Sequence, residues 1–169
     1  MNQRIVLNYT SLTTPIGTFL VVASPKGLCS LRLIEGRSMK SVLDEVRRDY
    51  SDTDFVADDK AVKPLARKIE AVIAGRLAAS DVPLDMRGTP FQKRVWQELA
   101  RVPWGKTYSY SELARKVGKP KAVRAVASAC ARNPVTFVVP CHRIVSKGGG
   151  LGGYYWGLEM KQRLLEREK

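Results

Sequence analysis

The sequence predicts an α+β protein of two domains, a small α/β domain over residues 1–85 and a mostly helical domain over residues 86–169. Strand-like runs separated by turn signals fill residues 4–34, whereas helix start and stop signals dominate after Thr89. The charge divides at the same boundary, with 12 Lys/Arg against 11 Asp/Glu in the first part and 17 against 5 in the second. A chain of 169 residues is long enough to bury a core in this arrangement.

The first domain is expected to begin with three strands joined by tight turns. These strands are residues 5–9, 18–23 and 28–34, with proline–glycine turns at residues 15–17 and 25–27. Amphipathic helices are expected over residues 39–50 and 63–74, because apolar residues recur there at helical spacing. The acidic stretch 52–59 between the two helices is expected to be a loop.

The second domain carries the signals of three helices. Thr89 followed by Pro90 marks the start of the first, since threonine caps a helix and proline suits its first position. A second helix is expected from Ser109 to Gly118, and a third over residues 121–132. Two short helices joined by a tight glycine-containing turn form a helix-turn-helix pattern, which many helical pairs that never touch DNA also share.

The third of these helices is rich in alanine and has Arg124 as its one long central side chain. Small residues let a helix approach a surface closely but supply few groups that read base edges, so sequence-specific recognition is not expected. A lone arginine on such a face can enter the base stack or the minor groove of DNA. The alternative is a helix that packs on the core with Arg124 in solvent.

The composition limits the partners and the compartment. Basic charge concentrated in one half favours a polyanionic partner such as nucleic acid, because a solubilising charge would be spread over both halves. No apolar run approaches the ~20 residues of a membrane span and no signal peptide is visible, so a cytoplasmic protein with no membrane partner is expected. Three cysteines and one histidine match no zinc spacing, so no metal is expected.

Cys141 and His142 are the most informative pair for chemistry, because His142 is the only histidine in the chain. A thiol becomes a good nucleophile when a base or a positive charge makes its thiolate accessible. Adjacent side chains on a strand diverge, so the two would meet only through a bend or a bound water. The alternative is a cysteine packed as a small hydrophobe, which is also the expected role of Cys29 and Cys130.

The segment Pro140-Cys141-His142-Arg143, preceded by Asn133-Pro134 and followed by Gly153-Tyr154, resembles the active-site segment of the O6-alkylguanine-DNA alkyltransferases. The resemblance extends over residues 88–168 and includes Arg-Gly-Thr-Pro-Phe-Gln and Gly-Lys-Thr-Tyr-Ser-Tyr. It implies a ribonuclease H-like first domain and a winged helix-turn-helix second domain. It also implies a monomer that binds double-stranded DNA from the minor groove.

The same resemblance implies DNA repair by a methyltransferase that acts once. By this resemblance, the alkyl group of O6-alkylguanine or of O4-alkylthymine is expected to pass irreversibly to Cys141 after the damaged base is flipped out, with no cofactor. His142 removes the thiol proton through a water, and Glu168 holds the histidine in the right tautomer.

Glu168 lies in an expected C-terminal helix over residues 158–168. Glu166 competes for the role, because the end of that helix could shift by a turn, but the spacing from Tyr154 favours Glu168. Asn133 braces the turn between the recognition helix and the active-site segment.

The remaining site residues also come from the resemblance. Tyr110 helps to displace the DNA backbone and donates a hydrogen bond to guanine, although packing on the core is the ordinary role of such a tyrosine. Arg124 occupies the space left by the flipped base. The other residues expected at the DNA lie around Arg124: Lys121, Ala122, Ala125 and Ser128. The residues expected to line the substrate pocket are Ile144, Tyr154, Tyr155 and Trp156.

Three other functions fit parts of the sequence. A lesion sensor would bind alkylated DNA without restoring guanine. A thiol hydrolase or redox protein would turn over a small ester or disulfide. A helix-turn-helix regulator would bind one DNA sequence selectively, but the alanine-rich helix supplies few side chains that could read bases.

Overall fold

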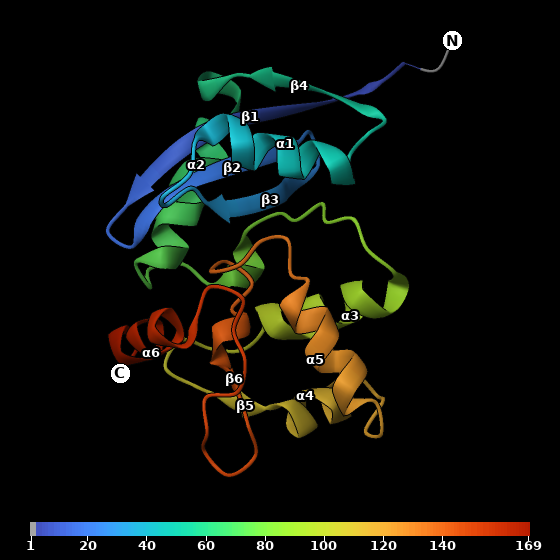
Figure 1. Ribbon diagram of the computed structural model, residues 1–169, viewed down its shortest axis with the longest axis vertical. Coiled ribbons are helices and arrows are strands. Elements are labelled where there is room, and N and C mark those ends of the chain that lie inside the picture. The colour runs from blue at the N-terminus through green and yellow to red at the C-terminus, as the bar shows by residue number, and fades with distance from the viewer. Residues whose placement is uncertain (1–2) are drawn as a thin grey trace.

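The computed structural model describes residues 3–169, in which a sheet and two helices precede a mostly helical part (Figure 1). The expected order of an α/β part followed by a helical part is confirmed at this level. The four-stranded sheet has the order β3-β2-β1-β4, with β1 parallel to β4 and the other neighbours antiparallel. Its strands are β1 (Ile5–Thr14), β2 (Gly17–Ser24), β3 (Gly27–Leu33) and β4 (Thr53–Ala57).

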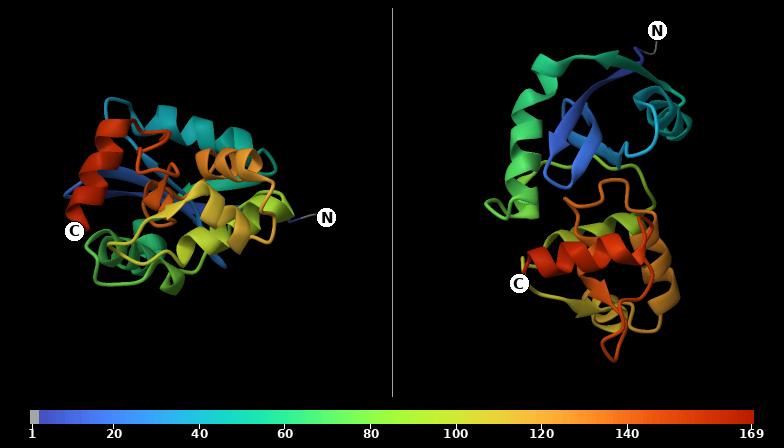
Figure 2. Two further views of the ribbon diagram at one scale, coloured as in Figure 1. Left: turned by 90° about the horizontal axis from the view of Figure 1, so that it is seen from below. Right: turned by 60° about the vertical axis from the view of Figure 1, so that its left-hand side comes forward.

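One helix covers each face of this sheet, as the right-hand view of Figure 2 shows. Successive side chains of a strand point to opposite faces. On β2, Leu20 and Val22 therefore pack with helix α1 (Met39–Asp49), whereas Phe19 and Val21 pack with helix α2 (Asp59–Ile73). The sheet thus separates two hydrophobic clusters, and only the α2 side continues into the second half of the chain.

Three expectations for the first part were wrong. Residues 52–59 do not form a loop, because Thr53–Ala57 pairs in parallel with β1 as the edge strand β4. The first strand runs on to Thr14 rather than ending at residue 9, since its second half forms the hairpin with β2. Helix α2 begins at Asp59 rather than at residue 63, because the Asp58 side chain accepts a hydrogen bond from the Ala61 amide and caps it.

The second part contains four helices and a short parallel pair of strands, β5 (Tyr108–Ser109) and β6 (Ile144–Val145). Both expected helix starts at Thr89 and Ser109 are confirmed, and each has a complete capping box. The helix expected from residue 121 begins two residues later, because a turn from Lys119 to Ala122 precedes it. The helices are α3 (Pro90–Ala100), α4 (Tyr110–Lys116), α5 (Val123–Ala131) and α6 (Leu158–Arg167).

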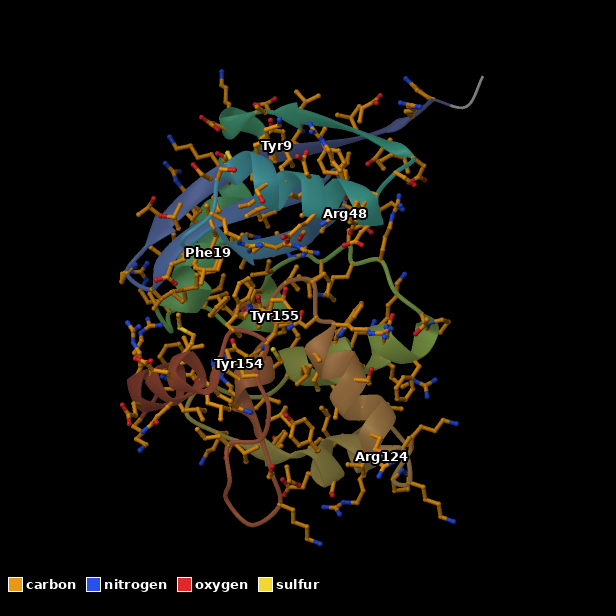
Figure 3. The ribbon with its side chains drawn as sticks, viewed as in Figure 1. Tyr9, Phe19, Arg48, Arg124, Tyr154 and Tyr155 are labelled. Atoms are coloured by element: carbon orange, nitrogen blue, oxygen red, sulfur yellow. The ribbon has the colours of Figure 1, made fainter. Side chains whose placement is uncertain are left out.

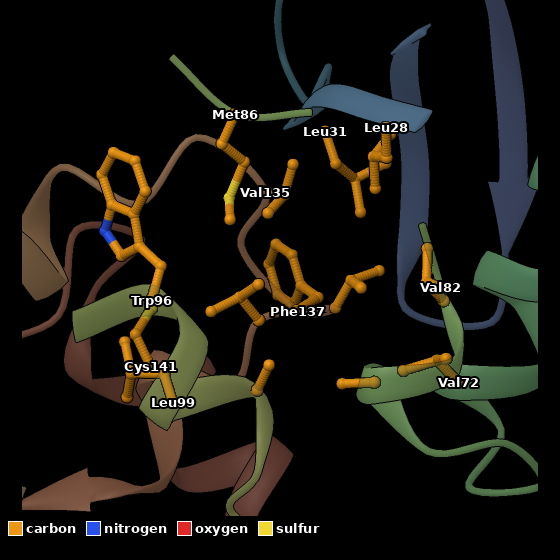
Figure 4. Packing of buried hydrophobic residues seen from close by; sticks show 14 of the residues in the cluster. Leu28, Leu31, Val72, Val82, Met86, Trp96, Leu99, Val135, Phe137 and Cys141 are labelled. Carbon is orange, nitrogen blue, oxygen red and sulfur yellow. The ribbon is translucent and has the colours of Figure 1, made fainter. Parts of the chain in front are cut away.

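The two parts share one hydrophobic core. Figure 4 shows Leu28, Leu31 and Val82 packed on the same cluster as Trp96, Leu99 and Cys141, with Phe137 in the middle. Phe137 has a φ of 74°, which is costly for a bulky residue, and its ring contacts Phe19 at 5.1 Å between centroids. The segment that leads to Cys141 is therefore anchored on the N-terminal sheet.

No helix within residues 3–169 is long and apolar enough to cross a membrane.

Candidate active site

A tight 3-10 turn, Cys141–Arg143, carries the two residues singled out by their chemistry. The bend required to bring adjacent side chains to one site is therefore present. All three residues of the turn are buried. Asn133 supports the approach to this turn, because its Nδ2 donates to the Val139 carbonyl at 2.8 Å and its Oδ1 accepts from the Val135 amide at 3.0 Å.

A buried carboxylate joins His142 and Arg143. Glu168 Oε1 lies 2.8 Å from His142 Nε2, and the Arg143 guanidinium donates to both oxygens of Glu168 at 2.8 and 2.9 Å. Arg143 also donates to the Val102 carbonyl at 2.6 Å. Of the two candidate glutamates, the structure brings Glu168 to the histidine, while the exposed Glu166 accepts from Gln162 on the same helix.

The charges of this cluster determine which nitrogen of His142 is basic. Burial alone would raise the pKa of Glu168, but hydrogen bonds from His142 and Arg143 outweigh it and hold this pKa at about 2. Burial also lowers the pKa of His142, against the opposing effect of Glu168. A neutral imidazole beside an ionised carboxylate carries its proton on Nε2. Nδ1 is then a bare acceptor, and it is buried without a partner among the described residues.

The Cys141 thiol is protonated at neutral pH. Burial raises its pKa to about 11, and the Asn133 side chain and the Lys161 charge offset only part of that effect. Sulfur attacks as the thiolate, so this thiol needs a proton acceptor before it can act as a nucleophile. The bare Nδ1 of His142 belongs to the same turn and is such an acceptor.

Two tyrosines from different elements complete the surroundings of Cys141. Tyr110, the first residue of α4, donates to the Gly153 carbonyl at 3.5 Å. The Tyr154 hydroxyl is buried without a hydrogen-bond partner among the described residues. Burial raises the pKa of both phenols, and a thiolate formed at Cys141 would raise both further.

The other residues expected in the substrate pocket differ in their exposure. The Ile144 side chain is fully buried. Tyr155 is 66% exposed, and with Trp156 it lines a cleft of about 510 Å³ between the N-terminal part and α3. The indole of Trp156 donates to the Thr136 hydroxyl at 3.1 Å. Figure 3 shows Tyr154 and Tyr155 between the sheet and the lower helices.

Helix α5 presents the residues expected at DNA on its outer side. Its buried face consists of Val126, Ala129 and Cys130. Arg124 points away from the sheet at the far end of the molecule, as Figure 3 shows. The remaining residues expected at DNA are exposed or, for Ala122 alone, half-buried: Lys121, Ala122, Ala125 and Ser128.

Sequence reasoning missed two buried cations of the site, Arg143 and Lys161. Arg143 lies in the motif itself, but nothing in the sequence identified Glu168 as its partner. Lys161 is two helical turns before Glu168, so both lie on one face of α6 together with Leu164. That spacing is the signal that could have found Lys161.

These features define a class, an α/β protein with a buried cysteine–histidine–glutamate site beside a pair of helices in a basic half-chain. Two family models match the chain. Residues 7–86 match the 6-O-methylguanine DNA methyltransferase ribonuclease-like domain, and residues 90–169 match the DNA-binding domain of the same family. The chain belongs to the 6-O-methylguanine DNA methyltransferase family.

Similar proteins support this membership. The bifunctional transcriptional activator/DNA repair enzyme Ada of Escherichia coli is 39% identical over 98% of this chain, which spans only 46% of Ada. The methylated-DNA–protein-cysteine methyltransferase of Methanosarcina barkeri is 37% identical over 95% of this chain and 96% of its own length. The crystal structure of Mycobacterium tuberculosis OGT in complex with DNA superposes with a TM-score of 0.76, at 36% identity over 97% of this chain and 92% of that one.

Proposed function

We propose that this chain repairs DNA by direct reversal, accepting the alkyl group of O6-alkylguanine, or of O4-alkylthymine, on Cys141. The observation that carries this proposal is the buried relay in which ionised Glu168 orients neutral His142. It leaves a basic nitrogen in the same turn as a thiol that does not ionise unaided. Family membership and the charge of the second half support DNA as the substrate.

In the proposed reaction a water bridges Cys141 Sγ and His142 Nδ1. The thiol proton passes to the imidazole as sulfur attacks the alkyl carbon, and the carbon–O6 bond breaks. The guanine leaves with the electron pair of the carbon–O6 bond and takes up the thiol proton from the imidazole of His142. Tyr110 donates to the guanine ring and stabilises its developing charge. The thioether product is a poor leaving group, so each molecule acts once and needs no cofactor.

Base flipping and DNA binding belong to the same proposal. The first domain, residues 1–85, has a ribonuclease H-like fold, and the second, residues 86–169, is a winged helix-turn-helix unit. A monomer places α5 in the minor groove, where Arg124 replaces the flipped base and Asn133 braces the turn beyond the helix. The small exposed side chains of Ala125 and Ser128 support a close approach to the backbone. Lys121 and Ala122 begin the same surface.

The intact mass of the protein tests the proposal. After mixing with a stoichiometric amount of duplex DNA that carries one O6-methylguanine, the protein is expected to gain one methylene, mapped to Cys141. Cys141→Ala is the matched control and is expected to gain nothing. Tight lesion binding without a mass change would identify a lesion sensor instead. If the protein neither binds the lesion nor gains mass, both the repair function and the sensor function are contradicted.

Arg124→Ala is expected to slow transfer from duplex DNA by at least about tenfold, since extruding a base costs a few kcal/mol that the arginine helps to offset. Transfer from the free base O6-benzylguanine, which needs no flipping, is expected to be unchanged. Single-turnover rates with the two substrates measure the difference.

The control for this prediction is Arg48→Ala, which removes the same charge from an exposed position on α1. A variant of Arg48 that slows duplex repair as much as Arg124→Ala would show a general charge effect. An equal loss of rate on duplex and free base would contradict the role of Arg124 in flipping.

Trp156→Gly is expected to speed transfer from O6-benzylguanine. We propose that Ile144, Tyr154 and Tyr155 line the guanine pocket with Trp156, and that the indole narrows it. Thr136→Val is the matched control, because it removes the partner of the indole N–H and keeps the ring. Benzyl-transfer rates that do not rise in Trp156→Gly would exclude the indole as the size limit of the pocket.

A further inference from the structure

A buried lysine that the proposed reaction does not use lies beside the site. Lys161 on α6 is 0% exposed, although lysine is almost never fully buried unless it is paired. Its Nζ donates to the carbonyl oxygens of Ile144 at 2.6 Å, of Gly153 at 3.1 Å and of Leu151. Among residues 3–169 no carboxylate forms an ion pair with Lys161, and its ionisable neighbours include the thiols of Cys141 and Cys130 and the imidazole of His142. Carbonyl oxygens satisfy its hydrogen bonds without cancelling its charge.

The three carbonyls lie at the two ends of one loop. Ile144 directly follows the Cys141–Arg143 turn, while Leu151 and Gly153 stand at the far end of the glycine-rich segment. Within that segment Gly149 has a φ of 95° and Gly152 one of 70°, so the backbone depends on residues with wide conformational freedom. A single buried donor that binds both ends restricts this freedom and closes the loop.

The same lysine connects the loop to α4. The Tyr110 ring centroid lies 6.0 Å from Lys161 Nζ, and the Tyr110 hydroxyl donates to the Gly153 carbonyl that Lys161 also binds. Loop, helix α4 and helix α6 therefore meet at Lys161.

We propose that Lys161 is a positioning residue for alkyl transfer, whose buried ammonium holds residues 144–153 closed beside Cys141 and supplies a positive charge for the developing thiolate. This inference rests on the proposed function of Cys141 as the nucleophile. The Arg143 charge does not serve the same purpose, because both of its carboxylate contacts go to Glu168.

Among the described residues around the thiol, Lys161 is the one cationic side chain without a carboxylate partner, and burial lowers its pKa from the ordinary value. Burial raises the pKa of Tyr110 and of Cys130 to about 12, so both are neutral. Glu168 is compensated by Arg143. The ionisable groups that face this cluster come from every neighbouring element: Tyr110 on α4, Cys130 on α5, His142 and Arg143 in the turn, Tyr154 in the loop, and Lys161 and Glu168 at α6.

The test compares Lys161→Met, which removes the charge, with Lys161→Arg, which keeps it. Two rates are measured in each full-length variant, alkyl transfer from duplex O6-methylguanine and modification of Cys141 by iodoacetamide across a pH range. Reaction at Cys29 and Cys130 is subtracted with Cys141→Ala. Arg163→Met is the matched control, because it removes a positive charge from the exposed side of the same helix.

Lys161→Met is expected to slow both reactions by at least about tenfold at neutral pH and to move the iodoacetamide pH–rate curve to higher pH, since a tenfold rate change corresponds to one pH unit of thiolate formation. Lys161→Arg is expected to recover the position of that curve, and Arg163→Met to match the wild type. Hydrogen exchange at the Ser146 and Gly149 amides, which are bonded inside the loop, is expected to speed up in Lys161→Met.

Wild-type rates in Lys161→Met would overturn the inference. Slow alkyl transfer in both Lys161→Met and Lys161→Arg, with iodoacetamide reactivity unchanged, would also overturn the inference, because it would show only a structural role for Lys161. Circular dichroism checks that each variant folds. If Lys161→Met does not fold, it is replaced by Lys161→Gln, which removes the charge but keeps a hydrogen-bond donor. If the wild type transfers no alkyl group but the iodoacetamide difference persists, the proposed function fails while the effect of Lys161 on the thiol stands.

Discussion

Glu168→Ala is expected to lower the free energy of unfolding by about 3–5 kcal/mol, because it leaves a buried guanidinium without its counterion. Arg143 is 5% exposed and Glu168 7%, so solvent screens their pair only weakly. The same substitution removes the partner of His142 Nε2 and with it the tautomer that leaves Nδ1 free. Alkyl transfer is therefore expected to fall together with stability. Urea titration measures the first effect and single-turnover kinetics the second.

Glu166→Ala is the matched control for Glu168→Ala, because Glu166 is an exposed glutamate two residues away on the same helix end. It is expected to unfold and to react as the wild type does. Equal effects of the two substitutions would contradict the buried pair.

The pH dependence of stability gives Glu168 a second test. Its pKa is about 2 in the folded protein against 4.5 in the unfolded reference, so the unfolded chain binds its proton first as pH falls. The stability that Glu168 contributes is present in full above pH 4.5 and is lost as pH falls toward 2. The difference in unfolding free energy between wild type and Glu168→Ala is expected to shrink over that range. A difference that stays constant would exclude an ionised Glu168.

His142→Asn is expected to slow alkyl transfer at neutral pH by roughly 10²–10⁴-fold, the usual contribution of a positioned general base. The wild-type rate is expected to stay level down to about the ordinary histidine pKa, because burial lowers the pKa of His142 from 6.5 and keeps Nδ1 free of a proton there. Below that range protonation of the imidazole removes the base, and the rate falls.

The pH–rate profile of His142→Asn distinguishes a base from a structural residue. Without the imidazole, the thiolate forms only by ionisation of Cys141, whose pKa burial raises to about 11. The rate of the variant is therefore expected to climb with pH across the alkaline range, where the wild type is level. A variant profile parallel to that of the wild type would contradict the role of His142 as a base. Melting temperatures of the two proteins control for a loss of folding.

Local signals in the sequence identified much of the second half. Thr89 and Ser109 were recognisable as helix caps, because capping depends on the residue itself and on one three positions later. The β4 strand was missed for the opposite reason. Its acidic residues resemble a loop, and they form a strand because the edge of β1 offers a parallel partner about 48 residues earlier in the chain.

The residues of the candidate site also fall into those that the local sequence identifies and those that only tertiary contacts identify. Cys141 and His142 stood out through their residue types and their adjacency, which need no partner to be noticed. The competition between Glu168 and Glu166 stayed open until the helix rotation was known, because a shift of two residues turns a helical side chain from the core to solvent. Lys161 was missed because its partners are backbone carbonyls, which every residue has and no sequence distinguishes.

By itself the sequence determined the two-part α/β organisation, the basic second half and the cysteine–histidine pair, since each depends on composition, periodicity or adjacency along the chain. Only the tertiary structure decided which nitrogen of His142 is free, which glutamate orients it and which buried cation faces the thiol. Those properties depend on burial and on hydrogen bonds such as the one between His142 and Glu168, which are 26 residues apart in sequence and 2.8 Å apart in space.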